Sequence, residues 1–208
     1  MRGAGRLARG VPWSEAGGAK DGGCGSVMRA YPFGVVFSDD IDKAERWAVE
    51  HSKMTHRDPI ALAACAAMAV GTALTVTGEQ PETVWASMIE AAARQDSVTA
   101  AMMQRALADA ANGVEPEVTL ARLEGWAAHE AIAAGLYVAA RHPDDPRAAI
   151  LEGANTPGDS DSIATLAGAL VGARSGLERI PVEWLQDVER SSELLALAKE
   201  AAAAVGTA

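Results

Sequence analysis

The chain has 208 residues, and its 28 acidic against 18 basic side chains give a formal net charge of −10 at pH 7. A surface of this charge repels phosphate backbones and anionic lipids, so we expect neither nucleic acid nor a membrane as a partner. With 46 alanines and only 4% aromatic residues, the composition excludes a β-sandwich or barrel and predicts an all-α chain.

The length suits a single domain over residues 1–208. Residues 2–9 resemble the tail of a helix whose beginning is missing, so we expect this domain to be incomplete at its N-terminus. Cys24 and Cys65 form neither a disulfide framework nor a CxxC metal pair, and we find no signal peptide. These features favour a reducing, cytoplasmic environment.

The first strong helix signal along the chain is Ser38, as N-cap, followed by three aspartates that suit the positive end of a helix dipole. One face of this helix is predicted to carry Ile41, Ala44, Trp47, Ala48 and His51.

Asp58 and Pro59 then start a helix that continues to Gly78 without a charged side chain. The segment is long enough to span a bilayer, but alanine, threonine and glycine gain too little from transfer to lipid, so we expect a central buried helix. Further helix signals cover residues 81–95, 98–112, 126–142, 146–155 and 160–176, and a last helix runs from 181 into the C-terminal tail.

Three segments carry residues with possible chemistry. Asp159, Asp161 and Ser162 place three hard oxygen donors at a helix start, as Mg²⁺ or Mn²⁺ prefers, although aspartate and serine at such a position also serve as plain helix caps. The glycine-rich residues 21–29 offer backbone N–H groups to a phosphate, or form only a flexible loop beside a structural arginine. His56 precedes the buried helix, where a lone histidine is often structural.

Taken in order, these segments resemble the ADP-ribosylglycohydrolase family, whose motifs match along nearly the whole chain. Residues 23–34 match G-x-G-x-x-M-R-x-x-P-x-G, and residues 55–59 match T-H-x-x-P. Residues 126–131 look like the family's W-x-A-x-E-A helix, and residues 155–163 match N-x-x-G-D-[ST]-D-[ST]-I.

The resemblance implies a compact all-α fold and a centre of two Mg²⁺ or Mn²⁺ ions that hydrolyses the glycosidic bond between ADP-ribose and a protein side chain. ADP-ribose or an ADP-ribosylated protein is then the expected partner. By carry-over, the metal ligands are Asp159, Asp161 and Ser162, and the substrate-binding residues are Gly23, Cys24, Gly25, Ser26, Met28, Arg29 and His56.

One family segment is missing. Relatives carry a T-D-D-[ST] sequence with the remaining metal ligands upstream of the glycine-rich loop, and Asp39 and Asp40 follow that loop instead. Three donors do not fill two octahedral shells, so we expect this chain alone to hold an incomplete centre. Two hypotheses remain: a hydrolase whose other half is missing, or a catalytically silent helical protein that keeps the fold and ADP-ribose binding. Apolar surface left by the missing half would favour self-association.

Overall fold

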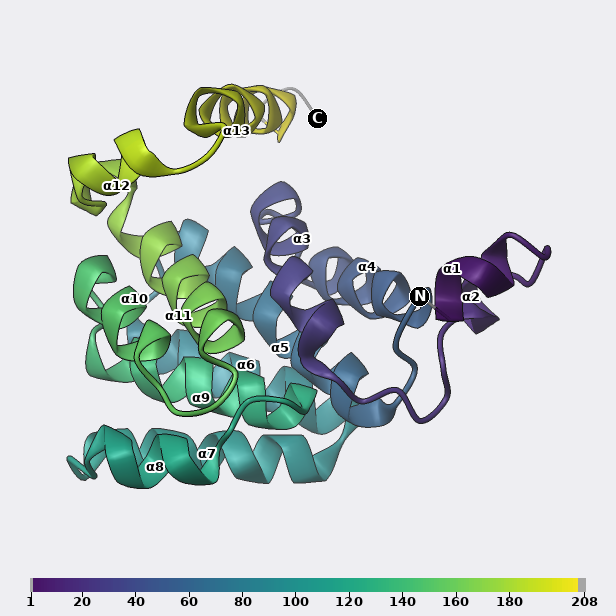
Figure 1. Cartoon of the computed structure of the whole chain (residues 1–208), viewed down its shortest axis with the longest axis horizontal. Helices are drawn as coiled ribbons and strands as arrows, with labels where there is room; N and C mark the ends of the chain where they lie inside the picture. The colour runs from purple at the N-terminus through teal and green to yellow at the C-terminus, as the bar shows by residue number, and fades with distance from the viewer. Residues whose placement is uncertain (1, 206–208) are drawn as a thin grey trace.

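The computed structural model describes residues 2–205 as an assembly of helices (Figure 1). Within that range no β-strand occurs, and two isolated bridges join Gly18 to His56 and Gly23 to Ala127. The elements of the first half are α1 (Arg2–Leu7), α2 (Trp13–Ala16), the 3-10 helix η1 (Cys24–Arg29), α3 (Tyr31–Val36), α4 (Ile41–Lys53), α5 (Pro59–Val76) and α6 (Pro81–Gln95). Those of the second half are α7 (Ser97–Ala111), α8 (Pro116–Arg122), α9 (Ala128–Arg141), α10 (Pro146–Ala154), α11 (Ser160–Ser175), the 3-10 helix η2 (Leu177–Arg179), α12 (Val182–Asp187) and α13 (Ser191–Val205). The all-α prediction is confirmed.

Helix α5 is the centre of the molecule. Its N-cap Asp58 accepts a hydrogen bond from the backbone N of Ile60 (3.2 Å), and Pro59 occupies the first turn, as the sequence predicts. Helices α3, α4, α6, α9 and α11 all pack around it. Among residues 2–205 it is the one helix long and apolar enough to cross a membrane, yet most of it is buried inside the protein. The prediction of a central buried helix is therefore confirmed.

A glycine on α3 lets that helix approach the backbone of α5 closely. A Cβ atom added to Gly34 of α3 would lie 2.8 Å from the Ala73 nitrogen and closer still to the Ala69 carbonyl oxygen. Since both atoms belong to the backbone of α5, no side-chain rotation relieves that contact. The close approach of α3 to α5 thus depends on this glycine.

We expect Gly34→Ala to destabilise the fold by about 1–3 kcal/mol, because α3 must move away from α5 to admit the methyl group. Urea unfolding followed by circular dichroism measures this change. Gly172→Ala in α11 is the matched control: a Cβ there meets nothing within 4 Å, so the better helix propensity of alanine should stabilise the protein by up to about 1 kcal/mol. Equal midpoints for the two variants would contradict this account of the α3–α5 contact.

Several boundaries differ from those predicted. The N-cap of α4 is Asp40, whose side chain accepts from Lys43 N (3.0 Å), and not Ser38. Helix α8, which starts at Pro116, was not predicted. The predicted last helix is two helices, α12 and α13, because the chain turns at Arg190 with φ +59°.

The predicted apolar face of α4 is correct only in part. Ala44 and Ala48 are fully buried, but Trp47 is 44% exposed, and Val49 and Ser52 are buried in its place. The small residues face α5, whose close approach leaves no space for an indole, so the large side chain turns outward.

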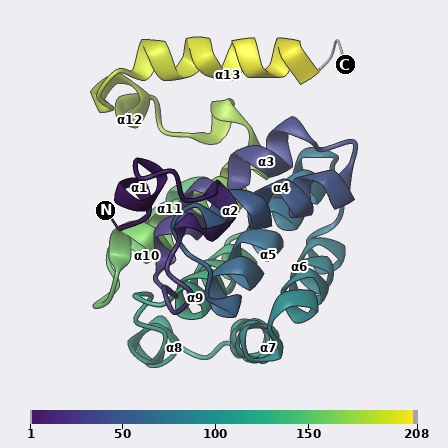
Figure 2. The same cartoon turned by 90° about the vertical axis from the view of Figure 1, so that its right-hand side faces the viewer.

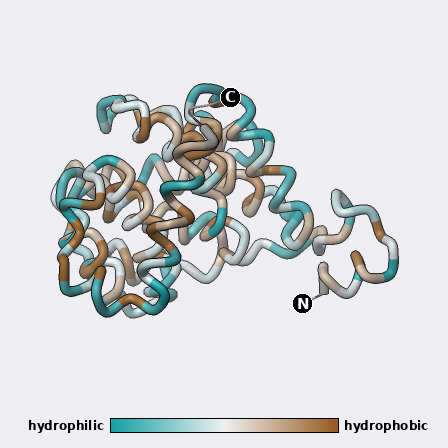
Figure 3. The backbone as a smooth tube through the Cα atoms, turned by 90° about the horizontal axis from the view of Figure 1, so that it is seen from above, coloured by the Kyte–Doolittle hydropathy of each residue, from teal (hydrophilic) through white to brown (hydrophobic). Residues whose placement is uncertain are grey.

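The first and the last helices lie at the periphery of the molecule (Figure 1). Helices α1 and α2 project to one side of the molecule at the end of α4, which α2 contacts (Figure 1 and Figure 3). Helix α13 lies across one side of the molecule beyond α3 (Figure 2), and its Leu194 and Leu197 are exposed. The expected self-association stays a prediction.

Candidate functional site

The start of α11 is fixed by a turn that comes before α9. Asp159 N donates to the carbonyl oxygen of Glu124 (2.6 Å), and a Cβ on Gly158 would clash with that same oxygen. Gly125 adopts φ +86°, a left-handed conformation that favours glycine. The glycines at 125 and 158 therefore bring two backbone segments into direct contact and set the position of Asp159.

The glycine-rich loop is bound to the other end of the same turn. Cys24 N donates to Trp126 O (3.2 Å), and Ala128 N donates to Gly22 O (2.8 Å). Glu130 Oε2 accepts from Ala127 N (3.2 Å), which caps the start of α9. The loop and the start of α11 are thus held against one common segment.

These contacts bring together side chains far apart in sequence. Cys24 Sγ donates to Asp159 Oδ2 (2.9 Å) and lies 3.4 Å from Ser162 Oγ. Ser162 Oγ donates to Asp159 Oδ2 (2.8 Å) and is 3.0 Å from Met28 Sδ. The sequence prediction that the start of α11 faces the loop of residues 23–29 is confirmed.

Asp159 does not act as a helix cap. It occupies the N-cap position of α11, yet its side chain makes no capping hydrogen bond to the helix backbone. Its carboxylate accepts hydrogen bonds from the side chains of Cys24 and Ser162 instead. The residue is only 7% exposed, so these contacts lie inside the protein. The capping interpretation of this aspartate is therefore wrong.

The electrostatics favour an ionised Asp159 beside a protonated thiol. Burial by itself would raise the pKa of Asp159, but its side-chain contacts with Cys24, Asp161 and Ser162 outweigh burial and lower that pKa. Burial, with the hydrogen bond to Asp159, raises the pKa of the Cys24 thiol. At neutral pH the site thus presents a carboxylate that accepts a hydrogen bond from a protonated thiol.

His56 and Arg29 lie at the other side of the loop. A Cβ on Gly25 would be 3.3 Å from His56 Cε1, so the imidazole packs directly against the loop backbone. His56 Nδ1 is 2.8 Å from Thr55 Oγ1, which also accepts from Arg29 Nη2. Burial lowers the pKa of His56, which keeps the ring neutral at pH 7, whereas Arg29 supplies an exposed positive charge.

Ser26, which the sequence analysis counts among the substrate-binding residues, turns its side chain into the protein. It is fully buried, and its hydroxyl accepts from Ser52 Oγ (2.9 Å) and lies 3.5 Å from Cys65 Sγ. Its side chain faces the core because η1 turns it toward α4 and α5. The side chain of Ser26 therefore supports the loop from inside, and the role of this residue in substrate binding stays a prediction.

Asp161 lies in the first turn of α11 and is exposed, next to Asp159. In the part of the chain that the structure describes, no group of three His, Cys, Asp or Glu side chains is close enough to hold a metal ion. Asp159, Asp161 and Ser162 still form a set of two carboxylates and a hydroxyl, the donor chemistry that Mg²⁺ and Mn²⁺ prefer. These donors match the chemistry of such an ion, and they would supply only part of its coordination shell.

Trp126 is a residue of the site that was not predicted from the sequence. Its carbonyl oxygen binds Cys24 N, and its side chain is 61% exposed beside the loop. Its position in the tryptophan-containing motif of residues 126–131 was the available signal in the sequence.

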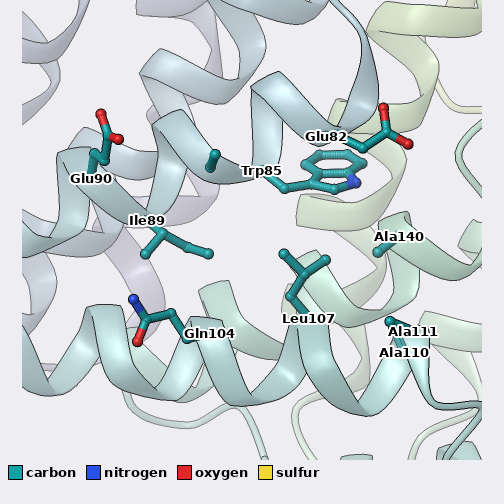
Figure 4. A pocket seen from close by; sticks show the side chains of 10 residues that line it. Glu82, Trp85, Ile89, Glu90, Gln104, Leu107, Ala110, Ala111 and Ala140 are labelled. Carbon is teal, nitrogen blue, oxygen red and sulfur yellow. The ribbon is translucent and has the colours of Figure 1, made fainter.

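A separate cavity of about 580 Å³ lies between α6, α7 and α9, and the close-up shows Trp85, Ile89 and Leu107 facing it (Figure 4). Glu82 and Glu90 stand at its edge, and none of its lining residues belongs to the motifs. Because its lining holds neither a histidine nor a hydroxyl or thiol nucleophile, this cavity is a poorer candidate for a catalytic site than the start of α11.

The sequence profile of the ADP-ribosylglycohydrolase family matches residues 1–208. An uncharacterized protein of Archaeoglobus fulgidus is 26% identical over 88% of this chain and 58% of its own length. The ADP-ribosylarginine hydrolase Tri1 of Pseudomonas putida is 26% identical over 94% of this chain and 50% of its own length. The chain thus spans about half the length of these curated relatives.

Similarity to a solved structure agrees with the profile. A protein described as an ADP-ribosylglycohydrolase-related protein complex superposes with a TM-score of 0.74 at 25% identity, over 97% of this chain and 66% of that one. The family motifs fall on the elements that build the site, namely η1, the start of α9 and the start of α11. The chain belongs to the ADP-ribosylglycohydrolase family.

Proposed function

We propose that this chain supplies the ADP-ribose-binding loop and part of the metal centre of a cytoplasmic hydrolase that removes ADP-ribose from a protein side chain. The observation that carries the proposal is the position of Asp159, an N-cap aspartate that does not cap. Its carboxylate is directed at the glycine-rich loop, where Cys24 contacts it. Membership of the family and the similarity to a relative named as an ADP-ribosylarginine hydrolase support the choice of substrate class.

The metal ligands in this proposal are Asp159, Asp161 and Ser162. When bound, Mg²⁺ or Mn²⁺ would orient the ribose hydroxyls and a water molecule and stabilise charge as the glycosidic bond breaks. The lowered pKa of Asp159 keeps its carboxylate ionised and ready to bind a cation. The contact with Cys24 holds that carboxylate in one orientation.

The loop residues are proposed to bind the ADP-ribose itself. Gly23 and Gly25 carry no side chain, so the imidazole of His56 can pack close to the loop backbone at both positions. Arg29 presents a cation to the diphosphate, and the neutral ring of His56 packs beside the loop. The exposed indole of Trp126 offers a surface on which the adenine could stack.

Isothermal titration with ADP-ribose, with and without Mn²⁺, tests the proposal. We expect Mn²⁺ to strengthen binding, and Asp159→Asn to remove that gain because the amide brings no negative charge to the cation. A loss of about tenfold in affinity corresponds to about 1.4 kcal/mol. Asp39→Asn is the matched control, since Asp39 is exposed near the start of α4 and belongs to none of the motifs. Identical metal dependence in wild type and Asp159→Asn would refute the assignment.

The small number of metal ligands favours a second function, which is binding of ADP-ribose without catalysis. Since the described residues contain no group of three acidic, histidine or cysteine side chains around one point, a catalytically silent protein that binds ADP-ribose without metal fits the same fold. ADP-ribose binding that is unchanged by Mn²⁺ and by Asp159→Asn, but weakened by Trp126→Ala, would identify this alternative.

A further inference from the structure

The cavity between α6, α7 and α9 has an apolar middle and a glutamate at each end. Helix α6 lines it with residues that recur at helical spacing and share one face of the helix, namely Glu82, Trp85, Ile89 and Glu90. Leu107 of α7 lies opposite this face (Figure 4). Glu82 and Glu90 are eight residues apart, which is about 12 Å along a helix axis. The cavity thus runs along α6 from one glutamate to the other.

No basic side chain of the cavity neutralises these two carboxylates. Its lining, taken from the part of the chain that the structure describes, holds no lysine, arginine or histidine, and neither Glu82 nor Glu90 forms an ion pair there. Arg94, one turn along α6 from Glu90, donates its side-chain hydrogen bonds to Glu45 instead. Both glutamates are exposed, so rotation about their side-chain bonds brings each carboxylate over its end of the cavity.

We propose that this cavity binds an elongated organic dication, an alkyl chain with a cationic group at each end. Its volume of about 580 Å³ lies in the range of about 300–1,000 Å³ that small-molecule sites occupy. Trp85, Ile89 and Leu107 cover the alkyl chain. Glu82 and Glu90 pair with the two cationic ends. Binding uses neither the glycine-rich loop nor the start of α11, so the inference goes beyond the proposed function and does not depend on it.

The alkyl chain and the charged ends contribute differently to this binding. Each methylene group removed from water strengthens binding about fourfold at most, so a chain of several methylenes supplies most of the affinity. An ion pair with an exposed carboxylate adds up to about fivefold. An anionic ligand is repelled by both glutamates and by the net charge of −10. The apolar middle thus sets the strength of binding, and the two glutamates select a cation of matching length.

Isothermal titration calorimetry with three ligands of equal chain length tests the proposal. We expect 1,8-diaminooctane, whose extended length is close to the separation of the two glutamates, to bind about two- to fivefold more tightly than octylamine. Octanoate should bind at least about tenfold more weakly than the diamine. Equal affinities for the diamine and octanoate, or no binding of the diamine, overturn the inference.

Variants of the cavity locate the bound ligand. Glu82→Gln and Glu90→Gln should each lower the affinity for the diamine to that for octylamine, whose own affinity changes by less than about twofold because one glutamate remains. Glu79→Gln is the matched control, since Glu79 is exposed just before α6 and does not line the cavity.

A fourth variant blocks the cavity from its rim. Ala86 is exposed on α6 and lines the cavity, so Ala86→Phe should weaken both amines at least about tenfold, with circular dichroism as the measure of an intact fold. Unchanged diamine binding in Ala86→Phe, or an equal effect of Glu79→Gln and Glu82→Gln, contradicts the assignment. If light scattering shows a dimer that Ala86→Phe dissociates and the diamine does not bind, a second copy of the chain occupies the cavity and the inference is wrong.

Discussion

Replacing Gly158 with alanine is expected to dismantle the site while leaving most helices in place. The new methyl group would lie 2.8 Å from Glu124 Cα and closer still to the Glu124 carbonyl oxygen, both backbone atoms. The segment that carries Asp159 must therefore move away from the turn at 124–125. Because overpacking costs about 1–3 kcal/mol and no flexible side chain relieves this contact, we expect a loss near the upper value.

Two measurements on this variant report on different consequences. Urea unfolding gives the change in stability, and the rate at which a thiol reagent modifies Cys24 reports whether its contact with Asp159 is broken. We expect faster modification in Gly158→Ala than in wild type. Gly172→Ala, at the other end of α11, should leave the rate unchanged, since a Cβ there meets no neighbour. Equal rates in Gly158→Ala and wild type would show that this glycine does not position Asp159.

Hydrolysis by the chain alone is expected to be far slower than ordinary enzyme turnover, which is about 10 s⁻¹. The three oxygen donors of the proposed metal site would fill about half of one octahedral shell, which is too few to hold two ions firmly. Electrostatic stabilisation of developing charge usually contributes more to catalysis than any other effect, and losing one such group costs about 10²–10³ in rate. Release of ADP-ribose from a modified protein in Mn²⁺ measures this deficit.

Addition of the part of the Pseudomonas putida relative that this chain does not cover is expected to raise the rate about a hundredfold or more. The same mixture made with Asp159→Asn should stay slow, which separates a completed site from activity of the added piece. Ordinary rates from the 208-residue chain alone, abolished by Asp161→Ala, would mean that the site is complete without additional ligands.

The sequence predicts this fold well where local signals are strong. Asp58 with Pro59, and the prolines at 81 and 146, mark helix starts that the structure reproduces, because a cap or a first-turn proline acts within one turn. Helix α8 begins with the same signal at Pro116 but has only seven residues, so its hydrophobic periodicity was too short to detect. The outward position of Trp47 depends on how closely α4 approaches α5, which no local pattern encodes.

The site was predictable in its outline but not in its contacts. The motif matches placed Asp159 and Ser162 near the glycine-rich loop, and the structure brings them together there. That Ser26 faces the core, and that the Cys24 thiol reaches Asp159, depend on the turn of η1 and on the backbone contact of Gly158 with Glu124. Both are long-range effects of packing, which spacing in the sequence does not reveal.

The separation of Cys24 from its partners also has a consequence for synthesis of the protein. Asp159 and Ser162 follow Cys24 by 135 and 138 positions, so the thiol has neither partner until late in translation. At about 5–20 residues per second, that interval lasts roughly 7–28 s. During it Cys24 lies on a nascent chain as an unpartnered thiol, open to oxidation and to metal ions, and it is protected only when α11 docks against the loop. Docking of α11 therefore doubles as the step that shields this cysteine.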